Sequence, residues 1–132
     1  MNIKIEKQKD GSYIAYNTDG GKFGLIGTGN TVSEAKEDFF NSVEEVKVLL
    51  KDEGEEIPVS LTESPIFHFD ISSLLEYYDV INVSAFSRFL GISDSLMRQY
   101  KRGNTYISDA QLARIEEGFH KLGKEMAELK LV

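Results

Sequence analysis

The stretch FSRFLGISDSLMRQYKR, residues 86–102, has the spacing of two short helices joined by a tight turn. Gly91 permits the turn, and Ser93 after it can cap the second helix by accepting a hydrogen bond from a free backbone N–H group. The small Ser87 stands where the second helix would press on the first. The apolar residues spaced to fill the wedge between two such helices are Phe86, Leu90, Ile92, Met97 and Tyr100. The pattern predicts a helix-turn-helix motif.

The outward face of the second predicted helix carries basic and hydrogen-bonding side chains. Arg98 and Arg102 are four residues apart and therefore share a face. Arginine can pair bidentately with guanine, glutamine with adenine, and serine or lysine with phosphate, and a helix N-terminus adds partial positive charge. We therefore predict a DNA interface formed by Ser84, Ser93, Asp94, Ser95, Arg98, Gln99, Lys101 and Arg102. The alternative is an ordinary helical hairpin with a solvated basic face.

The charge of the chain reverses locally around this motif. The 132 residues include 15 Lys+Arg against 22 Asp+Glu, for a formal net charge of −7. Residues 1–65 hold 7 lysines, no arginine and 13 acids, whereas all four arginines lie between Arg88 and Arg114. Residues 81–115 carry 5 basic and 2 acidic side chains, a net of +3. We predict an acidic front domain, residues 1–65, and a rear domain able to bind DNA, residues 66–132.

The front half alternates turn signals with short apolar segments. The predicted strands are Asn2–Lys7, Tyr13–Tyr16, Phe23–Ile26 and either Ile57–Leu61 or Ile66–Phe69. A long amphipathic helix begins after Thr31, with Glu34 completing a capping box, and ends near Gly54. The order β-β-β-α-(β) predicts an α+β fold, with one helix on a small antiparallel sheet, followed by an all-α domain.

Capping residues predict further helices in the rear half. Asp70 can begin a short helix, Asn82 or Ser84 another that runs to Leu90, and Ser108 a last helix toward Leu131. The last helix has apolar residues at steps of three and four: Leu112, Ile115, Phe119, Leu122, Met126 and Leu129. The repeat is heptad-like, and we expect Gly118 and Gly123 to weaken it.

Several kinds of site and location are disfavoured by the residues present. The chain has no cysteine, its apolar runs are far too short to span a bilayer, and its start has no signal-peptide core, so we expect a soluble cytoplasmic protein. His68 and His120 have no partners at ligand spacing, so no metal site is expected. Asp10, Asp19 and Asp38 are more typical of exposed turns than of a catalytic cluster. We expect no enzyme activity and no cofactor.

The order of these features resembles the HicB-type antitoxins of bacterial type II toxin–antitoxin systems. The hairpin KDGSYIAYNTD, residues 9–19, and the helix start GNTVSEA, residues 29–35, are similar to the front domain of that family. Residues 81–126, INVSAFSRFLGISDSLMRQYKRGNTYISDAQLARIEEGFHKLGKEM, resemble its helix-turn-helix tail. The chain departs from many members at residues 17–24, which lack a Pro-Asp-Leu-Pro-Gly-Cys-like segment.

The resemblance implies a partial RNase H-like front domain that is not catalytic. It implies a small basic HicA-like toxin as partner, an mRNA-cleaving ribonuclease whose RNA-binding surface the antitoxin masks. It also implies that the rear domain binds the operator DNA of its own operon, as a homodimer or a higher homo-oligomer. Two alternatives stay open: a stand-alone transcription regulator with a ligand-sensing N-terminal domain, and a residual nuclease that uses Asp10 or Asp19.

Overall fold

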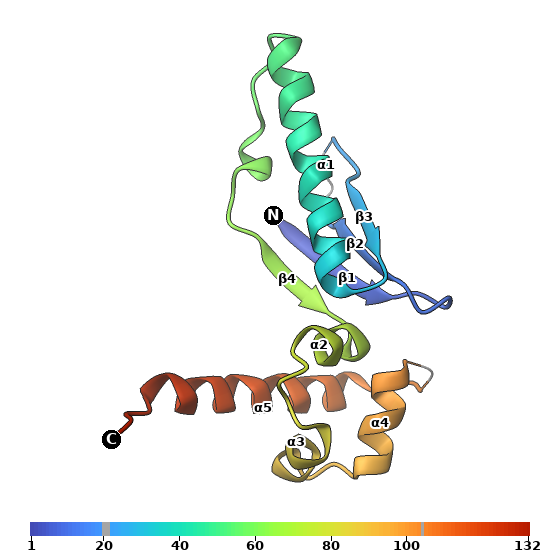
Figure 1. The fold of residues 1–132 in the computed structure, drawn as a ribbon, viewed down its shortest axis with the longest axis vertical. Helices are drawn as coiled ribbons and strands as arrows, with labels where there is room; N and C mark the ends of the chain where they lie inside the picture. The colour runs from blue at the N-terminus through green and yellow to red at the C-terminus, as the bar shows by residue number, and fades with distance from the viewer. Residues whose placement is uncertain (20–21, 104) are drawn as a thin grey trace. The chain divides into compact units, whose positions relative to one another are not determined.

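The computed structural model describes residues 1–19, 22–103 and 105–132, which form two compact units. Unit 1 is Met1–Asp79 and unit 2 is Val80–Val132. Unit 1 contains β1 (Asn2–Lys7), β2 (Tyr13–Asn17), β3 (Ile26–Gly29), α1 (Val32–Asp52), a 3-10 turn (Val59–Leu61), β4 (Ile66–Phe69) and α2 (Ile71–Tyr77). Unit 2 contains α3 (Val83–Leu90), α4 (Asp94–Arg102) and α5 (Asp109–Glu128). The mixture of sheet and helices confirms the predicted α+β class (Figure 1).

The sheet of unit 1 is mixed, so the prediction of a purely antiparallel sheet was wrong. Its strand order is β3-β2-β1-β4. β1 pairs with β2 and β2 with β3 antiparallel, but β4 pairs with β1 parallel. The physical reason is α1, which lies between β3 and β4 in the chain and returns it to the end of the sheet where β1 starts. Of the two candidate segments for a fourth strand, Ile66–Phe69 forms it and Val59–Leu61 is a 3-10 turn.

The third strand lies later in the chain than the predicted segment Phe23–Ile26. It is formed by Ile26–Gly29, and its two glycines lie against α1. A Cβ atom on Gly27 would lie 2.2 Å from the backbone nitrogen of Phe39, and one on Gly29 would lie 2.4 Å from the Cβ of Glu34. The strand therefore forms where the absence of side chains lets the helix approach the sheet.

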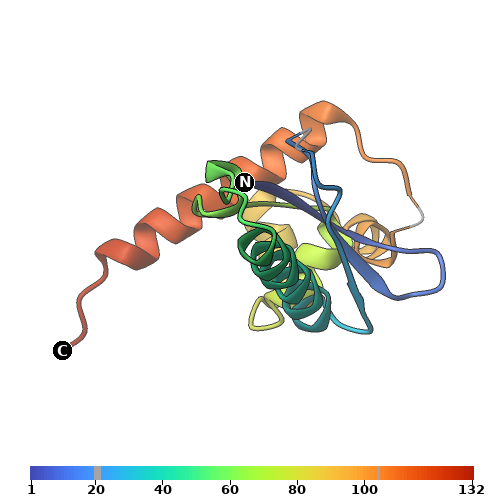
Figure 2. The same ribbon diagram turned by 90° about the horizontal axis from the view of Figure 1, so that it is seen from above.

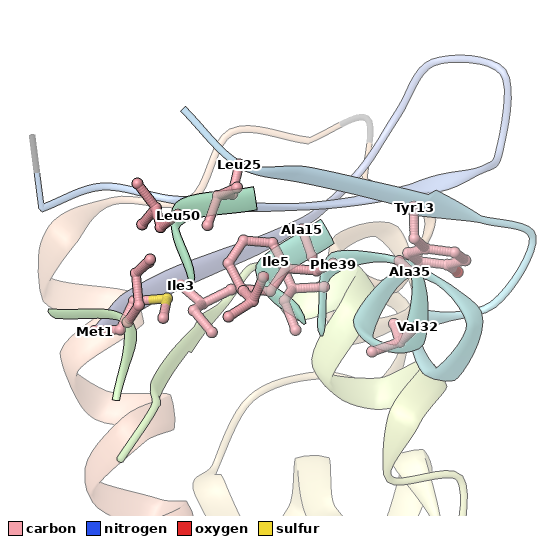
Figure 3. Packing of buried hydrophobic residues seen from close by; sticks show 12 residues of the cluster. Met1, Ile3, Ile5, Tyr13, Ala15, Leu25, Val32, Ala35, Phe39 and Leu50 are labelled. Atoms are coloured by element: carbon pink, nitrogen blue, oxygen red, sulfur yellow. The ribbon is translucent and has the colours of Figure 1, made fainter. Parts of the chain in front are cut away.

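α1 lies against one face of the sheet, as Figure 2 shows with α1 seen nearly end-on, and the core of unit 1 lies between the two. Thr31 caps α1 as predicted, because its Oγ1 accepts a hydrogen bond of 3.1 Å from the Glu34 N–H. The Glu34 carboxylate accepts one of 2.7 Å from the Asn30 N–H rather than from Thr31, so the capping box is displaced by one residue. Side chains packed together in Figure 3 include Ile3, Ile5, Ala15, Val32, Ala35 and Phe39, all fully buried.

Unit 1 extends beyond the predicted domain boundary at residues 65 and 66, to Asp79. β4 pairs with the first strand, and the Asp70 carboxylate accepts hydrogen bonds from the N–H groups of Lys7 (2.9 Å) and Ser73 (2.7 Å). The ammonium of Lys36 on α1 lies 4.2 Å from the ring centroid of Phe67 and donates a 3.1 Å hydrogen bond to the Tyr77 hydroxyl. These contacts attach β4 and α2 to the front unit, so the boundary falls after α2.

The helices of unit 2 begin at capping residues that were predicted from the sequence. Asn82, rather than Ser84, caps α3, Ser93 caps α4 and Ser108 caps α5. α5 packs on α3, where the Phe86 and Phe119 ring centroids are 4.4 Å apart. A Cβ on Gly118 would lie 2.0 Å from Leu90 Cδ2, so this glycine permits the crossing of α5 over α3. Among the described residues, no helix combines the length and apolar character needed to cross a bilayer.

Candidate nucleic-acid interface

The wedge between α3 and α4 is filled by the apolar residues that the spacing selected. These side chains are all buried: Phe86, Leu90, Ile92, Met97 and Tyr100. Ser87 is fully buried as well, and its hydroxyl donates a 2.7 Å hydrogen bond to the Val83 carbonyl. A larger residue at this position would separate the two helices, so the small side chain sets how closely they approach.

The turn between the helices is closed by Gly91, which adopts the left-handed conformation with φ +71°. The Ile92 N–H donates to the Ser87 carbonyl (2.9 Å), which ends α3 in the manner of a Schellman turn. The guanidinium of Arg114 on α5 donates a 3.5 Å hydrogen bond to the Gly91 carbonyl. The first residue of the loop is therefore held by its own conformation and by α5.

One face of α4 presents a cluster of charged and hydroxyl side chains to solvent. Arg98, Lys101, Arg102 and Ser95 are exposed and Asp94 is half-buried. All five fall within about 60° of Arg98 around the helix, given 100° per residue. The Arg98 guanidinium donates a 3.1 Å hydrogen bond to the Ser84 hydroxyl, so the structure brings the predicted residue of α3 to this face. We call these six residues the α4 face.

Two of the predicted residues have different surroundings. Gln99 is half-buried about 100° around the helix from Arg98, and its Oε1 accepts a 3.4 Å hydrogen bond from the Thr105 hydroxyl. The Ser93 hydroxyl is the helix cap and accepts from the Leu96 N–H (3.2 Å). Helical periodicity therefore turns Gln99 away from Arg98, and Ser93 is exposed at the start of α4 with its hydroxyl oxygen engaged as the cap.

Three further side chains of unit 2 lie outside the set predicted for the interface. Arg88 is exposed near the end of α3, and Tyr106, in the segment after α4, is 86% exposed. Arg114 was counted only as part of the basic segment, yet it contacts the turn at Gly91. The signal available for the arginines was their clustering within 27 residues, whereas an exposed tyrosine in a loop has no signature in the sequence.

The charge difference becomes larger when it is counted over the two units of the structure. Unit 1 contains 7 lysines, no arginine and 16 acids, a net of −9. Unit 2 contains 8 basic and 6 acidic residues, a net of +2. The three acids Asp70, Glu76 and Asp79, which a boundary at residue 65 would place in the rear half, belong to the front unit. Opposite net charges favour different partners for the two units.

The carboxylates considered for catalysis have structural partners in unit 1. Asp10 precedes β2 and accepts hydrogen bonds from the side chain and backbone of Ser12, which lower the pKa of its carboxyl. Asp19 follows β2, and bonds from the Asn2 N–H lower its pKa, with a smaller contribution from the N-terminal ammonium. Asp38 accepts from the Thr28 N–H (2.8 Å). Asp10 and Asp19 thus lie at opposite ends of a strand, and within the described ranges no group of three His, Cys, Asp or Glu could hold a metal.

A shallow apolar depression of about 360 Å³ lies at one corner of the sheet. It is lined by Ile14, Tyr16, Asn17, Gly24, Leu25 and Ile26. The side-chain amide of Asn17 donates to the Phe23 carbonyl and accepts from the Leu25 N–H, both at 2.9 Å. Its nitrogen and its oxygen are therefore both hydrogen-bonded. The Tyr16 hydroxyl donates to Glu6 (3.1 Å). Burial, and to a lesser extent this hydrogen bond, raises the pKa of Tyr16. These polar groups are engaged within the fold rather than directed at a ligand.

Comparison of the chain with protein-family models, with curated proteins and with solved structures gives no match in any of the three.

Proposed function

We propose that the protein is a HicB-type antitoxin that acts by binding alone, in the cytoplasm. In this proposal unit 1 binds a small basic HicA-like ribonuclease and masks its RNA-binding surface. Unit 2 binds operator DNA through the α4 face and represses the operon. The observed order β-β-β-α-β of unit 1 agrees with the order on which the resemblance to that family depends.

The observation that carries the proposal is the division of charge between the units. A unit with a formal net charge of −9 attracts a basic protein and repels nucleic acid, while the α4 face presents three cations on one short helix. Both properties in one chain suit a protein with two partners of opposite charge. Phosphate contacts from lysine and arginine supply affinity, and base contacts from arginine supply specificity.

A single helix-turn-helix makes few base contacts, so the proposal includes a homodimer or higher homo-oligomer. Two copies related by a two-fold axis would read two half-sites about 34 Å apart, one turn of DNA. The alternative of a ligand-sensing regulator receives less support, because the polar groups lining the depression on unit 1 are already hydrogen-bonded within the fold.

The test separates the two binding activities within one set of variants. The double variant Arg98→Ala with Arg102→Ala removes two cations from the α4 face, and the matched control Lys124→Ala with Lys130→Ala removes two exposed cations elsewhere in unit 2. Each purified protein is titrated onto DNA from its own promoter at several salt concentrations. In parallel, each is co-expressed with the adjacent reading frame and scored for growth and co-purification.

We expect the α4 double variant to lose at least about tenfold in operator affinity, since each base-reading arginine contributes about 1–3 kcal/mol. Its dependence on salt should also become shallower. Neutralisation of the toxin should be unchanged, and the control should bind DNA like the parent protein. Unaltered operator affinity in the α4 variant would refute the DNA interface, and an adjacent frame that encodes no toxic basic protein would refute the antitoxin assignment.

A further inference from the structure

The two edges of the sheet in unit 1 differ in whether their outward backbone groups are hydrogen-bonded. At β3, the outer edge is satisfied by side chains of α1. The Thr28 N–H donates a 2.8 Å hydrogen bond to the Asp38 carboxylate, and the Ile26 carbonyl accepts one of 3.2 Å from the Ser42 hydroxyl. A strand edge bonded in this way is poorly suited to pair with another chain.

The opposite edge, at β4, has no such cover among the described residues of unit 1. The Ile66 N–H donates to the Met1 carbonyl (2.9 Å) and the Asp70 N–H to the Ile5 carbonyl (3.1 Å). Even-numbered residues therefore turn their backbone groups toward β1. By the alternation of a strand, Phe67 and Phe69 turn theirs to the outer edge. No hydrogen bond to these N–H and C=O groups is found within the described part of the chain.

The side chains of β4 do nothing to discourage strand pairing. The strand is Ile-Phe-His-Phe, with no lysine, no acid and no proline inside it. Proteins usually blunt an open edge with such residues, with a bulge, with a covering element or by keeping the strand short. Here Pro65 precedes the strand and the N-terminus of α2 follows it, so the open edge is only four residues long.

We infer that β4 pairs antiparallel with β4 of a second copy of this chain, across a two-fold axis at His68. In this register Phe67 lies opposite Phe69 of the second copy. On each strand, the N–H and C=O groups of Phe67 and Phe69 point outward, which gives four free groups per edge. The pairing joins all of them in four N–H to C=O hydrogen bonds between the two strands. The two sheets then form one continuous eight-stranded sheet.

The chain itself selects this register over its neighbours. An axis at Phe67 would place Phe69 opposite Pro65, which has no N–H to donate. An axis at Phe69 would place Phe67 opposite Ile71, which is already helical in α2. Only the axis at His68 matches outward-facing groups on both strands throughout. A self-complementary edge of this kind favours a second copy over an unrelated strand.

The side chains agree with this arrangement. Phe67 and Phe69, whose ring centroids are 6.1 Å apart, lie on the α1 side of the sheet. In the paired strands each would lie opposite the other aromatic residue of the second copy, a stabilising cross-strand pair. His68 is exposed on the other face, beside Lys4 of β1, and would lie opposite His68 of the second copy.

A cysteine scan tests the register, since the chain contains no cysteine of its own. In the variant His68→Cys the two sulfurs would be opposite each other in a non-hydrogen-bonded pair, whose Cα atoms are about 4.5 Å apart, within reach of a disulfide. The matched control is Ile66→Cys, which lies on the same exposed face. Its two Cα atoms would be separated by about 13 Å along the strands, too far for a bridge.

Each full-length variant is oxidised at micromolar concentration and examined by non-reducing electrophoresis. We expect a covalent dimer from His68→Cys and at least tenfold less from Ile66→Cys. Equal or absent cross-linking in both variants would overturn the inference and leave the edge to a different chain.

A second pair of variants uses charge rather than a thiol. Tagged His68→Asp and untagged His68→Lys should each lose association through β4, because like charges would face each other, and should recover it as a mixed pair. Failure of the mixed pair to be captured above the level of either variant alone also counts against the inference. The inference deepens the proposed homo-oligomer, but these tests leave the α4 face intact, so a failure here is distinguishable from a failure of operator binding.

Discussion

Each unit places a glycine where its longest helix crosses its neighbour, but the two glycines meet different atoms. In unit 1 a Cβ on Gly27 would meet backbone atoms of α1, at 2.2 to 2.6 Å. In unit 2 a Cβ on Gly118 would meet the tip of the Leu90 side chain at 2.0 Å, and no backbone atom is among its nearest neighbours. A side-chain tip can rotate away, whereas a packed backbone cannot. The crossing in unit 1 is therefore the more tightly constrained of the two crossings.

The largest effect that this comparison predicts is on unit 1. Gly27→Ala should lower its free energy of unfolding by about 3 kcal/mol or more, since the methyl group must displace α1 from the sheet. Gly24→Ala is the matched control, because a Cβ there meets nothing within 4 Å, and it should change stability by less than about 0.5 kcal/mol. Urea unfolding followed by circular dichroism gives the free energies. Hydrogen exchange shows whether the loss is confined to amides of unit 1.

An equal stability of the two variants would contradict the close approach of α1 and β3. Loss of protection in α3, α4 and α5 as well as in the sheet would instead contradict the separation of the chain into two units.

A smaller effect is predicted in unit 2, where two glycines of α5 can be compared directly. A Cβ on Gly123 would meet nothing within 4 Å, so Gly123→Ala should stabilise the helix by up to about 1 kcal/mol through helix propensity. Gly118→Ala gains the same propensity but must displace the Leu90 side chain. We expect it to be less stable than Gly123→Ala by about 1–2 kcal/mol. Thermal unfolding of both variants measures the difference. Identical stability gains would show that α5 does not pack on α3 at Gly118.

The features that the sequence predicted well are those decided within a few residues. Thr31, Asp70, Ser93 and Ser108 each cap a helix where expected, because a cap needs only a side-chain oxygen and an N–H two or three residues later. The burial of the wedge between α3 and α4 also followed from spacing alone, since residues one helical turn apart share a face.

The features that were predicted incorrectly depend on distant parts of the chain. β3 is displaced because Gly27 packs on Phe39, and the boundary between the units is displaced because β4 pairs with β1, more than sixty residues earlier. In the candidate interface, the bond between Arg98 and Ser84 requires the angle at which two helices cross. No local pattern contains that angle. Both residues were therefore predicted for the interface, but their contact was not.

The smallest effect that we predict compares two buried serines, one in each unit. Ser73 of α2 and Ser87 of α3 are both fully buried. The Ser87 hydroxyl donates to the Val83 carbonyl, whereas the Ser73 hydroxyl finds no hydrogen-bond partner among the described residues. An unsatisfied buried hydroxyl costs about 1–3 kcal/mol, and a satisfied one contributes about 0.5–1.5 kcal/mol.

Replacing both serines by alanine should therefore give changes of opposite sign. Ser73→Ala should raise the stability of unit 1 by about 1 kcal/mol, because alanine removes the orphaned oxygen and favours the helix. Ser87→Ala should lower the stability of unit 2 by up to about 1 kcal/mol through the lost bond. Chemical denaturation of the two variants, side by side with the parent, measures both changes. A destabilised Ser73→Ala variant would mean that the hydroxyl does have a partner, such as a buried water, and that α2 is held to the sheet by more than apolar packing and the Asp70 cap.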